Sequence, residues 1–73
     1  MLLKKTHKQV QKALKKGLRV SIEFNHKTID ILMLIIRTSK TSKLLNSMAV
    51  FPKDQKDEKL AKTVKKLVKQ VTN

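Results

Sequence analysis

The chain has 73 residues, of which 18 are Lys or Arg and five are Asp or Glu, giving a formal net charge of +13. A chain this short forms one domain and buries too little apolar surface to be stable alone without a metal, disulfides or a partner subunit. It contains no Cys, and His7 and His26 lack acidic ligands nearby, which argues against disulfides and a zinc site. We therefore expect oligomerisation, and a polyanionic partner such as nucleic acid or an anionic membrane surface.

Membrane insertion and secretion are not expected. The longest apolar run, residues 31–36, has six residues, whereas a membrane-spanning helix needs about 20. Lysines are distributed throughout residues 1–16, and no apolar core followed by a small-residue cleavage site is present, so this stretch does not resemble a secretory signal. We expect a cytoplasmic protein, in the host cytoplasm if the protein is viral.

Residues 1–17 are predicted to form a basic N-terminal arm. Leu3, Val10 and Leu14 are spaced by seven and four residues, which could place them on one side of a helix. The same stretch is rich in like charges and poor in apolar residues, which is typical of a solvated, mobile segment. A flexible arm and a partly helical one both remain open at this stage.

Residues 18–24 alternate strictly between apolar and polar side chains, and Gly17 separates them from the arm. Because successive side chains of an extended chain point to opposite faces, this alternation predicts a β-strand. Its apolar positions, expected to face a core, are Leu18, Val20, Ile22 and Phe24. Its polar positions, expected to face outward, are Arg19, Ser21 and Glu23.

Residues 26–38 are predicted to form an apolar helix, with Asn25 as its N-cap. Two apolar stripes at helical spacing would surround it, formed by Ile29, Leu32, Met33 and Ile36, and by Ile31, Leu34 and Ile35. A helix that is apolar nearly all round must be buried, and one copy of so short a chain cannot bury it. A second copy could. The alternative is a second strand that forms a hairpin with residues 18–24.

Two further helices are predicted towards the C-terminus. Thr41 or Ser42 could cap a helix that extends to about Phe51, with apolar positions at Leu44, Leu45, Met48 and Phe51. Pro52 ends it. In residues 52–73, the acids Asp54, Asp57 and Glu58 stand near the start of a last helix, where negative charge complements the helix dipole. Its apolar stripe consists of Leu60, Val64, Leu67, Val68 and Val71.

This order of elements resembles the ribbon-helix-helix family of DNA-binding regulators. The resemblance covers residues 18–51, and its most specific part is the polar turn followed by two leucines at residues 39–45. The family implies a mostly α fold with one short β-strand, in which two protomers pair their strands into an intermolecular antiparallel ribbon. The helix of residues 52–73 would be an addition, as in an elaborated branch of the family found in archaeal viruses.

The resemblance also implies roles for individual residues. The ribbon would enter the major groove of double-stranded DNA, so base contacts would come from Arg19, Ser21 and Glu23. The start of the second helix would hold a backbone phosphate. Residues expected to contact phosphates are Lys15, Lys16, Lys40, Thr41, Ser42 and Lys43. Residues expected in the core of the homodimer are Val20, Ile22, Phe24, Leu32, Ile35, Ile36, Leu45 and Met48.

The sequence thus predicts a homodimeric, sequence-specific transcriptional regulator that binds double-stranded DNA. The alternatives are a basic protein that binds nucleic acid without sequence preference, and a module that binds a membrane surface or a partner helix. An enzyme is not expected, because Glu23 and Asp30 are isolated and no glycine-rich phosphate loop is present. Neither a cofactor nor a small-molecule substrate is expected.

Overall fold

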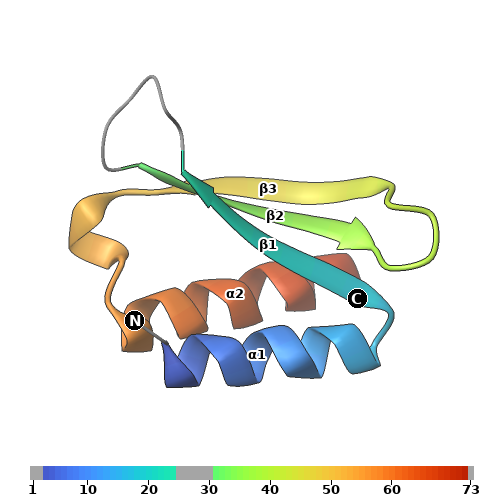
Figure 1. The fold of residues 1–73 in the computed structure, drawn as a ribbon, viewed down its shortest axis with the longest axis horizontal. Helices are drawn as coiled ribbons and strands as arrows, with labels where there is room; N and C mark the ends of the chain where they lie inside the picture. The colour runs from blue at the N-terminus through green and yellow to red at the C-terminus, as the bar shows by residue number, and fades with distance from the viewer. Residues whose placement is uncertain (1–2, 25–30, 73) are drawn as a thin grey trace.

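The computed structural model describes residues 3–24 and 31–72 as a two-layer α/β structure. Two helices form one layer and a three-stranded antiparallel sheet forms the other (Figure 1). In chain order the elements are helix α1 (Lys4–Lys15), strands β1 (Leu18–Phe24), β2 (Leu32–Thr38) and β3 (Leu44–Val50), the short 3-10 helix η1 (Pro52–Asp54) and helix α2 (Asp57–Thr72).

The sheet is a simple meander with β2 in its centre. Strand β1 pairs with β2 so that Val20 lies opposite Ile36, and β2 pairs with β3 so that Leu34 lies opposite Met48. A register shift between Ile36 and Arg37 interrupts the second ladder. Both helices cover the same face of the sheet (Figure 1), and the opposite face, called here the outer face, is covered by no described helix.

The core lies between the helices and the inner face of the sheet. Its fully buried side chains come from the middle of β2 and from α2, namely Leu34, Ile36, Leu60 and Val64. They belong to one cluster that also contains Ala13 of α1, Val20 of β1 and Val50 of β3. Every described helix and strand other than η1 therefore contributes to the same core.

Gly17 makes the sharp turn from α1 into β1. Its φ of +81° lies in the left-handed region, where a residue without a Cβ atom is favoured. The Gly17 amide donates to the Leu14 carbonyl at 3.0 Å, which closes the last turn of the helix. The Gly17 carbonyl accepts from the Ser39 amide at 3.0 Å, so this turn is also fixed to the end of β2.

The fold predicted from the sequence is wrong. Residues 3–24 and 31–72 form three strands and two α-helices in the order helix, sheet, helix, so the fold is not the mostly α ribbon-helix-helix arrangement with one short strand. The predicted strand at residues 18–24 is present as β1, but its partner is β2 of the same chain. In a ribbon-helix-helix dimer this strand pairs only with its copy in the partner subunit, whereas here β1 is the edge of a three-stranded sheet that one chain forms. The hairpin, left open as the alternative, is the arrangement found.

Two predicted helices are strands. In place of the helix at residues 26–38 the structure has β2, and the predicted cap at Asn25 and helix start at His26 lie outside the described residues. In place of the helix ending near Phe51 it has β3. The predicted apolar stripe forms no buried side, because all four of its residues are exposed, namely Leu44, Leu45, Met48 and Phe51.

The ends of the chain agree better with the sequence. The predicted last helix is present as α2, with Asp57 and Glu58 in its first turn. Of the two possibilities for the basic arm, the structure has the helical one, α1, in which Thr6 and Ala13 are buried. Leu3 and Val10 pack partly against the core, whereas Leu14 is 47% exposed.

The central position of β2 gives a direct prediction for stability. Leu34 has no exposed surface, so Leu34→Ala leaves a cavity and should lower the free energy of unfolding by about 2–5 kcal/mol. Leu14→Ala removes the same atoms from an exposed site and should change it by less than about 0.5 kcal/mol. Urea unfolding followed by circular dichroism measures both, and similar losses in the two variants would contradict this core.

Candidate nucleic-acid interface

The cationic side chains are separated from the sheet. None of the strands β1, β2 and β3 contains a lysine, whereas α1 and α2 are rich in them. The helices lie side by side and run in the same direction, so their N-terminal ends are neighbours (Figure 1). The positive charge of the described chain is therefore concentrated on the helical layer.

A groove runs between the two helices on the side away from the sheet. Its lining residues belong to α1, to the C-cap of α1 at Lys16 and to α2, and none of them belongs to a strand. Ala13, Ala61 and Val68 contribute its small apolar side chains, and Glu58 also lines it. The lysines that line this interhelical groove are Lys5, Lys8, Lys12, Lys15, Lys16, Lys62, Lys65 and Lys69.

Helical spacing explains why these lysines share one surface. Lys5, Lys8 and Lys12 follow one another at intervals of three and four residues, which keeps them on one side of α1. Lys62, Lys65 and Lys69 repeat the same intervals on α2. Each helix therefore presents a row of lysines to the groove. The larger apolar side chains of the helices lie on their other sides and pack on the sheet.

Asp57 holds the N-terminal ends of the two helices together. Its carboxylate accepts from the amide of Lys5 at 2.9 Å and from the amide of Thr6 at 2.8 Å. These are amides of the first turn of α1, which have no acceptor within their own helix, and the N-cap residue Leu3 provides no side-chain acceptor. The buried Thr6 hydroxyl also donates to this carboxylate, at 2.9 Å. A residue of α2 thus caps α1.

These interactions favour the ionised carboxylate. Partial burial raises the pKa of Asp57, but hydrogen bonds from the amides of Lys5 and Thr6, the Thr6 hydroxyl and the charge of Lys5 lower it more, and the pKa falls below its ordinary value of 3.8. The negative charge also lies at the positive N-terminal end of α2. Asp57 therefore compensates part of the repulsion between two lysine-rich helices at their closest ends.

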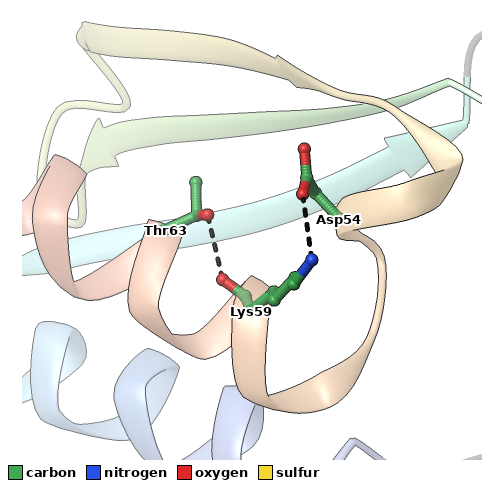
Figure 2. Close-up of polar contacts among 3 residues, drawn as sticks. All are labelled: Asp54, Lys59 and Thr63. Carbon is green, nitrogen blue, oxygen red and sulfur yellow. Dashed lines mark hydrogen bonds and ion pairs between the residues drawn. The ribbon is translucent and has the colours of Figure 1, made fainter.

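The other flank of α2 differs from the groove. Figure 2 shows Lys59, whose ammonium lies 3.8 Å from the carboxylate of Asp54 and whose carbonyl accepts from the Thr63 hydroxyl at 3.0 Å. Lys59 lines no part of the groove. Within the groove, Lys62 lies 4.0 Å from Glu58, an exposed ion pair of small energetic value.

The residues predicted to contact bases lie away from this groove. Arg19, Ser21 and Glu23 alternate with the inward-facing residues of β1, and they therefore lie on the outer face of the sheet. Arg19 and Glu23 are exposed, and Ser21 is half-buried. The structure does not bring them together with the lysine rows.

The predicted phosphate-binding residues separate into two groups. Lys15 and Lys16 line the groove. The turn at Lys40, Thr41, Ser42 and Lys43 connects β2 to β3 and is not the start of a helix. Its amides are used internally, because Ser42 donates to the Thr38 carbonyl at 2.9 Å and Lys43 donates to the Thr38 hydroxyl at 3.0 Å. The expected helix N-terminus for a phosphate is therefore absent from this turn.

The residues predicted for a dimer core have mixed burial in the single chain. Val20, Leu32 and Ile36 are buried, and Ile35 is half-buried. The others remain exposed, namely Ile22, Phe24, Leu45 and Met48. The groove itself was not predicted: of its lysines only Lys15 and Lys16 were expected to contact phosphates, and none of those on α2 was. Their spacing of three and four was visible, but which side of each helix faces the other was not.

Removing the cap should weaken the fold in a pH-dependent way. In Asp57→Asn the charge is lost, so the midpoint of thermal unfolding should fall at neutral pH. A carboxyl with a lowered pKa stabilises the fold fully above its ordinary value of 3.8 and loses this contribution as the pH falls through the lower, folded value. The difference between Asp57→Asn and wild type should therefore shrink below about pH 4. A difference that stays constant from pH 7 to about pH 3 would contradict this role.

Comparison with known proteins identifies no relative: no protein-family model, no curated protein and no solved structure matches the chain. Among residues 3–24 and 31–72, no helix is long and apolar enough to span a bilayer. The same residues contain no cluster of three or more His, Cys, Asp or Glu side chains suited to a metal ion.

Proposed function

We propose that this protein binds double-stranded nucleic acid through the interhelical groove, mainly by contacts between lysines and backbone phosphates. The observation that carries the proposal is the pair of lysine rows that faces one groove. Along α1, the row from Lys5 to Lys15 extends about 15 Å at 1.5 Å per residue. A duplex carries one negative charge per about 1.7 Å of its axis when both strands are counted, so about 15 Å of duplex carries about nine phosphate charges, of which those on one side face the groove.

Backbone contacts are favoured over recognition of sequence. Lysine ammonium groups act as point charges towards phosphates, whereas sequence is read by hydrogen bonds to base edges in the grooves. The two-stranded ribbon that was expected to read bases is not found, because β1 belongs to a three-stranded sheet of its own chain. We therefore propose a basic protein that binds nucleic acid without sequence preference, which was one of the alternatives to a sequence-specific regulator.

A duplex is favoured over a single strand or a membrane. Proteins that bind single strands stack bases on aromatic side chains, and no aromatic residue lines the groove. Phe24 ends strand β1, and Phe51 directly follows β3. A helix that binds a membrane surface buries its apolar face in the lipid, whereas the apolar sides of α1 and α2 already pack on the sheet.

The groove predicts which lysines set the salt dependence of binding. Lys65 lies where the two parts of the groove meet and lines both of them, whereas the adjacent Lys66 lines neither. With a short fluorescein-labelled duplex, Lys65→Ala should weaken binding and reduce the slope of log K against log salt by about one. Adding Lys12→Ala should reduce the slope by about two in total. Lys66→Ala, which removes the same charge from the same helix, should leave the slope close to that of wild type. Equal effects of Lys65→Ala and Lys66→Ala would contradict binding in the groove.

The kind of polyanion is tested with the wild-type chain. Binding of unrelated duplex sequences with equal affinity supports the proposal, and comparing DNA with RNA duplexes distinguishes two sources of the same phosphate chemistry. A large preference for one sequence would contradict contacts limited to the backbone. Preference for a single strand, or for vesicles of anionic lipid, would contradict the proposal as a whole.

A further inference from the structure

The central strand is apolar on both of its faces. Leu32, Leu34 and Ile36 are buried beneath the helices, while Met33 and Ile35 lie between them in the sequence and face the other way. A strand with one solvated face normally alternates between apolar and polar residues, and continuous apolar runs are typical of strands covered on both faces. Met33 and Ile35 remain half-buried on the outer face, which no described helix covers.

The neighbours of these residues are mostly uncharged and include no lysine. Ser21 and Ser47 flank Ile35, and Ala49 and Glu23 flank Met33. Leu44 and Leu45, at the start of β3, are both exposed. Charges occur towards the two ends of this surface, where Arg19 and Arg37 pair at one end and Glu23 lies at the other.

We infer that the outer face of the sheet binds a second copy of this chain, sheet against sheet, with the strands of the two copies running in opposite directions. The two-fold axis then passes near Ile35, which stands midway between the row of Glu23 and the row of Arg37. Each Ile35 packs near its own equivalent, as an isologous interface requires. The inference needs no nucleic acid and does not rest on the proposed function.

Charge distribution is what points to a second copy as the occupant. A chain with a net charge of +13 repels its own copies. The outer face is the surface where this repulsion is weakest, because the strands contain no lysine and both helices lie on the far side of the sheet. Sheet-to-sheet contact therefore brings together the least charged surfaces and leaves both lysine grooves exposed.

The charges that do lie on this face are complementary in the antiparallel arrangement. Glu23 and Arg19 are about 13 Å apart within one chain, since they stand four residues apart on β1. When the copies run in opposite directions, β1 faces β1 of the partner subunit, so Glu23 lies opposite Arg19 of the partner subunit, and the reverse pair forms at the other end. A parallel arrangement would instead place arginines against arginines.

The edges of the sheet are poorer candidates for pairing with another chain. At the free edge of β3, the Asn46 side chain accepts from the Ser47 amide at 2.9 Å and donates to the Gln70 side chain of α2 at 3.2 Å. This amide is therefore not available to a further strand. The edge strand β1 carries Arg19 and Glu23, and charged side chains on edges disfavour strand addition.

Sedimentation of the wild-type chain, without nucleic acid, tests the inference. The face is small, about 14 Å by 24 Å, so we expect a dimer that dissociates on dilution between about 200 and 1 µM. Ile35→Lys places two ammonium groups near the axis and should give the monomer mass at all these concentrations. Leu14→Lys makes the same change on α1, away from the sheet, and should remain dimeric. Circular dichroism verifies that each variant is folded.

Charge exchange gives a second test that leaves the apolar residues in place. Glu23→Arg should weaken the dimer at least tenfold, because three arginines of the two copies then meet at each end. Combining it with Arg19→Glu restores opposite charges across the interface and should recover most of the loss. The two sites are too far apart within one chain for this rescue to arise from the monomer.

Three results would overturn the inference. The first is a wild-type chain that stays monomeric at about 200 µM, above the range where small interfaces dissociate. The second is a folded Ile35→Lys variant that remains dimeric, which would place the contact at a strand edge or on the helices. The third is a double charge exchange that fails to recover any affinity relative to Glu23→Arg.

Discussion

The contact between Asp57 and the first turn of α1 holds the N-terminal ends of the two helices together. The rest of the structure depends on this placement of the helices. It caps amides that Leu3 leaves without a side-chain acceptor, and it joins residues more than fifty positions apart in the chain. Without it, two parallel helices rich in lysine would have unsatisfied donors and like charges at the same end. The Asp57 carboxylate accepts hydrogen bonds from these donors and adds a negative charge among the lysines. The same interactions lower its pKa.

Once the helices are fixed, the molecule separates charge from apolar surface. The exposed sides of the helices contain the lysines, and the sheet contains mainly aliphatic residues. The core forms where the helices pack on the sheet. A small domain gains from this separation, because a single cationic surface can be neutralised by one polyanion. The cost of this arrangement is an outer sheet face with half-exposed Met33 and Ile35, which one short chain has no further element to cover.

Several elements could be predicted because their residues carry a clear period. Strict alternation identified β1, and the spacing of apolar residues together with early acids identified α2. Residues 31–36 have no period, and a continuous apolar run fits a strand buried on both faces as well as a buried helix. The spacing of Leu44, Leu45 and Met48 imitated a helical stripe, although these side chains are exposed on a strand. The family resemblance rested on that misassignment, and its base-contacting and turn residues lie apart from the groove.

The sequence by itself determined the charge, the absence of Cys, the strand after Gly17 and the amphipathic C-terminal helix, because each of these depends on composition or on local periodicity. Only the tertiary structure decided that β1 pairs within its own chain and that the two lysine rows face one groove. Strand pairing and helix orientation depend on contacts between residues far apart in the chain, such as Thr6 with Asp57 and Val20 with Ile36. Local spacing carries no information about which of these distant partners will meet.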